Sequence, residues 1–348
     1  MLSLSSSSLQ IIIPFRGSLD HLEDCVKKCR LYSPKNANIL VFDDRSTFVE
    51  KPDFLTENEY FPTGGVGLSQ VVEFSKKYIS ADFVAIMAGD DIPAPNRFNL
   101  QLDLLSSQRL DLSIGRQEKF KQKNSRMPAL AGSFLGDVFD SSILLLGAYG
   151  ADGTIMMTST FYREKYILDP TDSFSDWSLA LSQYPHSKIS YTDTVLVYYR
   201  QHSGQVTRNT RNLWIESKVK NHWLALLSEL TDIKLVSQAA LNVIAAPWYR
   251  SDVNKEEIDE ALEILNKIIE SYKKNKLDRI TIASIEKIII RRLIFRMNFA
   301  NAFFLLKRLS NLDISNVYRK TLFESLTLCY EFIRSIGNAP RIINPPAR

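Results

Sequence analysis

Three pairs of aspartates mark the first half of the chain, and each pair follows or adjoins an apolar segment. The pairs are Asp43 and Asp44, Asp90 and Asp91, and Asp172 and Asp176. Ligands of an open α/β sheet bind just beyond the carboxyl ends of its strands. Carboxylates gathered there repel one another unless a cation joins them, and a divalent metal that carries a phosphorylated ligand meets that need. The pattern therefore predicts a metal and phosphate site at one edge of an α/β sheet.

Short apolar runs alternate with segments of helical period through the first 200 residues. We expect strands at 9–14, 39–42, 83–87, 154–158 and 195–199, and helices at 19–29, 68–78, 97–105 and 178–183. Such alternation implies a mainly parallel central sheet with right-handed crossovers. The polar and basic segment Gln117 to Pro128 contains few apolar residues, so we expect a mobile loop there. This α/β domain is predicted to span residues 1–210.

The composition changes after that point. From residue 211 onward there are 22 Lys and Arg against 15 Asp and Glu, whereas the preceding part has 21 against 24. Gly337 is the only glycine beyond Gly204. Asn254 and Glu257 have the spacing of a capping box, and Ile285 to Leu309 forms a second long helical pattern. The sequence thus predicts an α-helical C-terminal domain over residues 211–348.

The segment Lys287 to Arg308 contains no acidic residue. It is either a solvated helix face packed on a neighbour, or a basic surface for anionic lipid or a phosphorylated acceptor. Whether the C-terminal helices bind the acceptor, contact a membrane or form a homo-oligomer stays open. Nucleic-acid binding is not expected, because the basic excess is small and lacks interleaved aromatic motifs.

The sequence shows no recognisable secretory signal or membrane span, and this and its cysteine usage lead us to expect a cytoplasmic protein. Peripheral contact with the inner face of the cell membrane is the alternative. The apolar run Ile11 to Ile13 is too short for a secretory signal, and no stretch approaches the roughly 20 apolar residues of a membrane span. Cys25, Cys29 and Cys329 show no metal-ligand spacing, which is typical of buried thiols in a reducing compartment.

Five motifs in order give residues 9–205 a resemblance to the inverting nucleotide-sugar glycosyltransferases of family 2, which have the GT-A fold. The motifs are Ile12-Ile13-Pro14-Phe15, Phe42-Asp43-Asp44-Arg45-Ser46, Met87-Ala88-Gly89-Asp90-Asp91 with Pro95 and Arg97, Ser175-Asp176-Trp177, and Tyr199-Arg200-Gln201-His202. Each is weak alone, but their order and spacing together are specific. The resemblance implies a GT-A nucleotide-sugar-binding domain followed by the helical domain.

The chain departs from the family pattern at three places. Ala88 stands where the metal motif Asp-x-Asp usually has its first acid, which leaves Asp90 as the matching ligand. The stretch that begins at Gly65 and reaches Val72-Glu73 lacks the family's amide and arginine near the sugar, so the donor's identity stays open. Ser175 replaces the acid that usually precedes the catalytic base.

The resemblance implies a role for each matching residue. Asp90 is the expected ligand of Mn²⁺ or Mg²⁺, and Asp176 is the expected general base that removes the acceptor's proton. The remaining substrate-binding candidates are Pro14 at the end of the first strand, Asp43 or Asp44 for the base or ribose, Asp91 to order the loop, Trp177 as a wall for the sugar, and Arg200 and His202 for the diphosphate.

Each of these residues also has a purely structural alternative. Asp44 and Asp90 could belong to ordinary turns, and Asp176 could cap the helix that follows it. Trp177 and His202 could pack without contacting a ligand, and Gly64 to Gly67 lacks the spacing and lysine of a phosphate-binding loop, so it is expected to be a plain loop. Asp172 competes with Asp176 as the base.

The expected function is transfer of a sugar, with inversion, from a nucleotide-diphosphate donor of the UDP type to a hydroxyl group. The resemblance further implies a glycan or lipid-linked glycan acceptor in bacterial surface polysaccharide, lipopolysaccharide or glycoprotein assembly. A non-catalytic glycan-binding or scaffold protein is the first alternative, motivated by Ala88 and Val72-Glu73. A sugar-phosphate nucleotidyltransferase is less favoured, because Pro14 to Gly17 is too short for its glycine-rich loop.

Overall fold

The computed structural model describes residues 7–45, 50–121, 125–127, 152–171, 175–183, 187–202, 219–234, 236–237 and 255–274. The predicted helix at 285–309, its basic segment 287–308 and Cys329 lie outside the described residues. Cys25 and Cys29 are buried free thiols, as expected. The described residues can therefore test the predicted α/β domain, but only part of the helical one.

The strand β1 (Leu9–Phe15) forms the centre of the sheet because its aliphatic residues are buried on both faces. It pairs in parallel with β2 (Asn38–Asp43) on one side and with β4 (Phe83–Ile86) on the other, so that Ile11 is aligned with Ile39 and Ala85. The short β3 (Tyr60–Pro62) extends this parallel group next to β2.

The second half of the sheet continues beyond β4. The strand β8 (Met156–Thr158) is antiparallel to both β4 and β6 (Leu112–Lys121), and β6 pairs in parallel with β9 (Ile189–Gln201). Two short strands, β5 (Ile92–Pro93) and β7 (Ser125–Met127), are antiparallel to β9 and β6. Because β8 reverses direction between β4 and β6, the strands β1, β2, β3, β4, β6 and β9 all point the same way. The predicted α/β domain with a mainly parallel sheet is confirmed.

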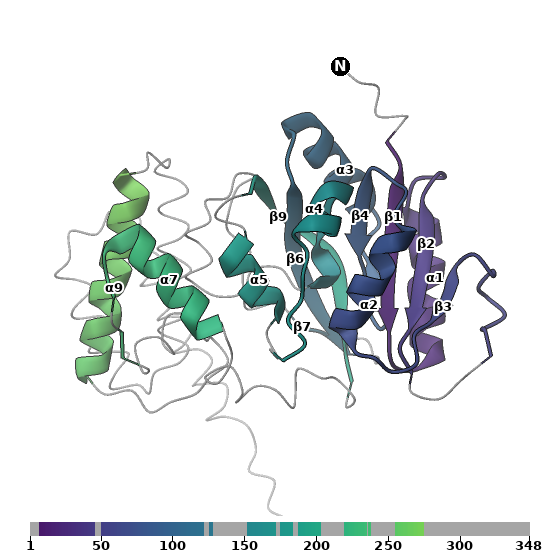
Figure 1. Ribbon diagram of the computed structural model, residues 1–348, viewed down its shortest axis with the longest axis horizontal. Helices are drawn as coiled ribbons and strands as arrows, with labels where there is room; N and C mark the ends of the chain where they lie inside the picture. Colours follow the sequence, from purple (N-terminus) through teal and green to yellow (C-terminus); the bar gives the residue numbers. More distant parts are fainter. Residues whose placement is uncertain are drawn as a thin grey trace, which may run out of the picture.

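Helices cover both faces of this sheet (Figure 1). On one face, α1 (Leu19–Tyr32) and α3 (Arg97–Gln108) bury apolar side chains against the odd-numbered residues of β1 in the main core cluster. On the other face lie α2 (Leu68–Ser75), the short η2 (Lys76–Tyr78) and α4 (Ser159–Glu164). The hydroxyls of Ser75 and Tyr162 form a buried hydrogen bond that joins α2 to α4.

The structure differs from the sequence-based expectation between β6 and β7. The expected loop at Gln117–Pro128 was wrong for the described residues, because β6 and β7 form an antiparallel pair in which Lys119 is aligned with Met127. The residues of β6 also pair with β9, and this long-range pairing overrides the polar composition of the segment. The expected strand at 154–158 begins only at Met156, since Asp152–Thr154 forms the 3₁₀ turn η4.

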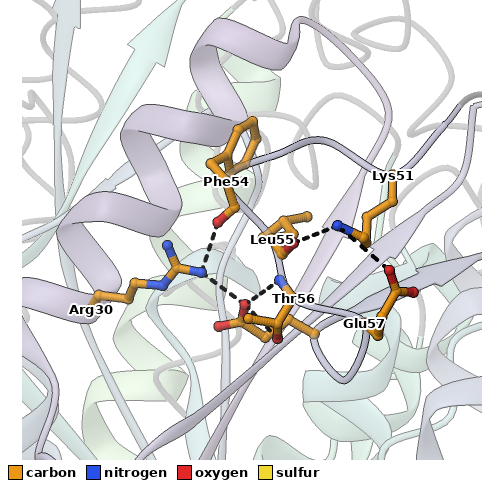
Figure 2. A network of polar contacts seen from close by, with 7 residues as sticks. Arg30, Lys51, Phe54, Leu55, Thr56 and Glu57 are labelled. Carbon is orange, nitrogen blue, oxygen red and sulfur yellow. Dashed lines mark hydrogen bonds and ion pairs between the residues drawn. The ribbon is translucent and has the colours of Figure 1, made fainter.

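A polar network ties the segment between β2 and β3 to α1 (Figure 2). The Arg30 guanidinium donates to the carbonyl of Phe54 at 2.9 Å and to the Glu59 carboxylate at 2.8 Å. Glu59 also accepts from the backbone and hydroxyl of Thr56, while Lys51 donates to the carbonyl of Leu55. These contacts fix the start of β3, and with it Tyr60, beside the end of β2.

Close packing also fixes the turn that follows β4. A Cβ atom on Gly89 would lie 2.8 Å from Cδ2 of Phe15, the last residue of β1. Such an approach is too short for real Cβ atoms, so only glycine lets the turn sit against this ring. The contact sets the distance between the ends of β1 and β4.

The described part of the C-terminal region is helical, as predicted. It contains α7 (Val219–Thr231) and α9 (Lys255–Lys274), which pack together, and α7 also packs against α5 (Ser175–Gln183) of the first domain. Trp223 of α7 is completely buried. Within the described ranges, no helix is both long and apolar enough to cross a membrane. The predicted domain boundary at residue 210 stays a prediction.

Replacing Trp223 with alanine should lower the free energy of unfolding by about 3–5 kcal/mol, because a large buried side chain is lost and a cavity remains. Urea denaturation followed by circular dichroism measures this change. The exposed Asn221 of the same helix provides the control, since Asn221→Ala should shift stability by less than about 0.5 kcal/mol. Equal effects of the two variants would contradict the packing role of Trp223.

Replacing Gly89 with alanine should destabilise the protein by about 1–3 kcal/mol, because the new methyl group overpacks the Phe15 ring. Thermal denaturation of Gly89→Ala and of the natural protein measures the difference in stability. Gly17→Ala is a matched control, since its Cβ would lie 3.7 Å from the same ring, an ordinary contact distance. A Gly89→Ala protein as stable as Gly17→Ala would show that the ring moves aside freely.

Candidate functional site

Asp43 lies at the end of β2, and its carboxylate is hydrogen-bonded to other residues of the protein. It accepts hydrogen bonds from the backbone and guanidinium of Arg45, with Nε at 2.9 Å, and from the Tyr60 hydroxyl at 2.9 Å. Burial works to raise the pKa of Asp43, but the bonds from Arg45 and Tyr60 outweigh it and lower the pKa. Asp43 is therefore an ionised residue that organises this strand end, with Arg45 also lying over the Phe15 ring.

Asp44 connects the same strand end to the glycine-rich loop. Its carboxylate accepts from the Thr63 hydroxyl at 2.9 Å and from the backbone N–H of Gly67 at 3.0 Å. Gly67 has a φ of 92°, a region that favours glycine, and it directly precedes α2. The loop is thus held by Asp44. Pro14, in β1, is aligned with Phe42 and lies between the ends of β2 and β4.

The turn after β4 carries Ala88, Gly89, Asp90 and Asp91, and a buried arginine supports it. Arg97, 1% exposed, donates to the carbonyl of Ile86 at 2.8 Å and contacts Met87 Sδ. Burial lowers the pKa of Arg97 to about 10, which leaves it charged at neutral pH. The turn itself closes with the bond from the Asp91 N–H to the Ala88 carbonyl.

Asp91 points into the protein and is 3% exposed. Its carboxylate accepts the backbone N–H of Arg200 at 2.8 Å, so it joins the turn to the end of β9. Burial, followed by the neighbouring Asp90, raises the pKa of Asp91 to about 8. This contact is made to the protein's own backbone, and the role of Asp91 in substrate binding stays a prediction.

Asp90 points the other way and meets His202. Its side chain is 34% exposed, and its Oδ2 lies 2.9 Å from Nε2 of His202, a residue 112 positions later in the chain. The Arg200 guanidinium donates to the Asp90 carbonyl at 2.8 Å and to the Asp24 carboxylate at 3.1 Å. Because β9 and β4 point in the same direction, their carboxyl ends meet at one edge of the sheet. Sequence motifs from both ends of the domain are thereby brought together.

His21 in α1 is a neighbour of this group that the sequence did not single out. The rings of His21 and His202 have their centroids 5.3 Å apart. Burial, and then the positive charge of Arg200 and the presence of His202, lower the pKa of His21, which favours its neutral form. Arg45, Tyr60 and Asp24 were also missed. Arg45 lies in the motif at the end of β2, whereas Tyr60 begins β3 and Asp24 lies within α1, where no motif marks them.

The two remaining candidates lie at the start of α5. Asp176 and Trp177 are the second and third residues of this helix, whose described side chains Leu179 and Leu181 are buried. The side chains of Asp176 and Trp177, and the whole of Asp172, lie outside the described residues. The choice between the two aspartates as base therefore stays a prediction.

A metal ion would find two protein donors in this group, Asp90 and His202. Within the ranges that the structure describes, no three His, Cys, Asp or Glu side chains are grouped so as to hold an ion. A site built here would thus depend on phosphate oxygens and water for its remaining ligands, as Mg²⁺ sites that carry substrate phosphates commonly do.

Comparisons with known proteins show similarity to glycosyltransferases. Residues 10–166 match the family model described as glycosyl transferase family 2. An uncharacterized glycosyltransferase of Rickettsia conorii is 21% identical over 252 residues, covering 68% of this chain and 40% of that protein. One from Rickettsia felis is 22% identical over 250 residues, covering 66% and 39%. The chain thus spans about two fifths of the length of these curated relatives.

Two solved structures also resemble the chain. The crystal structure of S. aureus TarS 1–349 in complex with UDP-GlcNAc has a TM-score of 0.48 and 12% identity, covering 86% of this chain and 89% of that one. The crystal structure of GalNAc-T7 with UDP, GalNAc and Mn²⁺ has a TM-score of 0.47 and 13% identity, covering 68% and 50%. Residues 10–166 match glycosyl transferase family 2, in agreement with the order of the sequence motifs and with the α/β architecture of this segment.

Proposed function

We propose that this protein transfers a sugar from a nucleotide-diphosphate donor, of the UDP type, to a hydroxyl acceptor with inversion at the anomeric carbon, and that a divalent cation assists. The match of residues 10–166 to glycosyl transferase family 2 supports the nucleotide-sugar donor. The observation that carries the proposal is the pairing of Asp90 with His202, which meet at the carboxyl ends of two strands of the parallel sheet.

The Asp90–His202 pair fits a divalent cation. Asp90 Oδ2 and His202 Nε2 are separated by 2.9 Å, so both atoms would hold one ion once the proton between them is released. Carboxylate oxygen suits both Mn²⁺ and Mg²⁺. Both side chains are partly exposed, so they are accessible to a ligand from solvent. Ala88 contributes no donor, which makes His202 the second protein ligand in this proposal.

The surrounding residues define the chemistry. When bound, the cation would supply Lewis-acid stabilisation for the diphosphate leaving group. Arg200 holds the Asp90 carbonyl, and Asp91 holds the Arg200 backbone, so the Asp90 carboxylate is kept directed at His202. Asp176 would remove the proton of the acceptor hydroxyl as the oxygen attacks from the face opposite the leaving group, as inversion requires. Trp177 beside it would form a wall for the sugar.

The acceptor and the cellular setting belong to the same proposal. We infer a glycan or lipid-linked glycan acceptor in bacterial envelope polysaccharide or glycoprotein assembly, in the cytoplasm and in contact with the inner face of the membrane through the basic segment 287–308. The match of residues 10–166 to glycosyl transferase family 2 and the charge asymmetry of the sequence support this setting.

A non-catalytic glycan-binding protein is the second candidate, and α2 favours it. Val72 is buried, and Glu73 forms an ion pair with Lys76, so neither provides the amide or positive charge expected near the donor sugar. Ala88 removes one acid of the metal motif. Measured turnover of a nucleotide sugar would separate the two candidates.

Replacing Asp90 with alanine should abolish the gain in UDP affinity that Mn²⁺ provides to the natural protein, because one of two protein donors is lost. Isothermal calorimetry with UDP, with and without Mn²⁺, measures it. His202→Ala should have a similar effect, and the double variant should lose no more than about 0.5 kcal/mol beyond the larger single effect, since residues that share one partner are non-additive.

The exposed Asp103 of α3 offers a matched control, since Asp103→Asn removes a negative charge elsewhere on the domain and should leave UDP affinity unchanged. Additive losses from Asp90→Ala and His202→Ala would contradict a shared cation. An affinity for UDP that is indifferent to Mn²⁺ in the natural protein would refute metal dependence.

Replacing Asp176 with asparagine should leave UDP binding nearly intact and lower turnover by about 10²–10⁴-fold, because the general base is removed while the shape is kept. A panel of nucleotide sugars screened by thermal stabilisation first identifies the donor. UDP release with that donor then measures turnover. Asp172→Asn is the comparison variant: if it stops turnover and Asp176→Asn does not, Asp172 is the base.

A further inference from the structure

One face of α1 contacts the residues that surround Asp90, although these residues come from distant parts of the sequence. The Asp24 carboxylate accepts from the Arg200 guanidinium at 3.1 Å, across 176 positions of the chain. One turn earlier, the His21 ring lies against the ring of His202. One position after Asp24, the Cys25 thiol donates to the carbonyl of Ala88 at 3.5 Å. The helix thus reaches both β9 and the turn after β4.

The contact with Asp24 matters because Arg200 is buried. The Arg200 side chain is 4% exposed, whereas that of Asp24 is 55% exposed. A buried guanidinium is costly unless its charge is paired and its N–H groups are bonded. Asp24 supplies a carboxylate from the rim, while the other side of the guanidinium binds the Asp90 carbonyl. Asp24 therefore fixes the orientation in which Arg200 holds the turn.

The contact with His21 restrains His202, the second proposed ligand of the cation. Ring packing at 5.3 Å, with planes tilted by 51°, limits the rotation of the His202 imidazole. That imidazole presents Nε2 to Asp90. His202 is the first residue after β9, so its backbone lies outside the strand, and the ring of His21 from α1 packs against its side chain.

We propose that His21 and Asp24 are positioning residues of the donor site: Asp24 acts through Arg200 and His21 acts through His202, and together they set the geometry of the Asp90–His202 pair for the divalent cation. This inference rests on the proposed function. Groups that orient metal ligands from the outer shell typically change metal affinity by about 10–100-fold when they are removed.

The first test measures the Mn²⁺-dependent affinity for UDP by calorimetry. Asp24→Ala should weaken it about 10–100-fold, and Asp24→Glu should restore part of the loss. Glu23→Ala is the matched control, because it removes the adjacent carboxylate of α1, which pairs with Lys27, and should change nothing. An unchanged affinity in Asp24→Ala would overturn the role of Asp24.

The histidine is tested by two replacements. His21→Phe keeps an aromatic ring against His202 and should retain the Mn²⁺-dependent affinity, whereas His21→Ala should weaken it about 10–100-fold. If His21→Phe loses as much affinity as His21→Ala, the imidazole nitrogens themselves are required, and the positioning role is wrong. If both variants bind as the natural protein does, His21 has no role in the site.

A measurement without metal or nucleotide separates this inference from the proposed function. Asp24→Ala should lose hydrogen-exchange protection at the Arg200 amide, whose bond to Asp91 depends on a fixed Arg200, while Glu23→Ala should not. Loss of protection supports the positioning role even if the natural protein binds no Mn²⁺, in which case only the metal proposal fails. Unchanged protection of the Arg200 amide in Asp24→Ala would overturn the positioning role of Asp24, even if the natural protein binds Mn²⁺.

Discussion

The hydrogen bonds of Arg200 are the interactions on which the candidate site depends most. The backbone N–H binds Asp91, and the guanidinium binds the Asp90 carbonyl and Asp24. One residue at the end of β9 thus joins the turn after β4 and a helix on one face of the sheet. The arrangement works because β9 and β4 point the same way, so that their carboxyl ends lie at a common edge.

The two aspartate pairs show how identical side chains acquire different roles from their surroundings. Asp43 is buried, yet a guanidinium and a hydroxyl keep it ionised and lower its pKa. Asp91 is buried with a backbone amide as its main donor and with Asp90 beside it, so its pKa rises to about 8. Only Asp90 directs a partly exposed carboxylate outward, toward His202. Three of the four acids are buried, and Asp90 is the one with a partly exposed carboxylate.

The sequence predicted the parallel half of the fold well, because the strands at Leu9–Phe15 and Asn38–Asp43 contain short continuous apolar runs, which favour buried strands. It failed at Gln117–Pro128, where pairing with a strand about 80 residues away stabilises a polar segment. At the site, the motif residues Asp90, Arg200 and His202 lie together in the structure, and their functional roles stay predictions. The supporting residues His21 and Asp24 could not be found, because their roles come from contacts across the fold and their local sequence carries no motif. Arg45 stands within a motif, but the motif gave it no role of its own.

The position of β9 in the chain has a consequence for biogenesis. It is the last described strand of the sheet, and it supplies Arg200 and His202 to a turn formed by Asp90 and Asp91, more than a hundred residues upstream. During synthesis, the first strands and helices emerge and can pack well before these residues leave the ribosome. A nascent chain that ends before Arg200 therefore carries the Asp90 turn without Arg200 and His202, and the pairing of Asp90 with His202 arises only once the last described strand has docked.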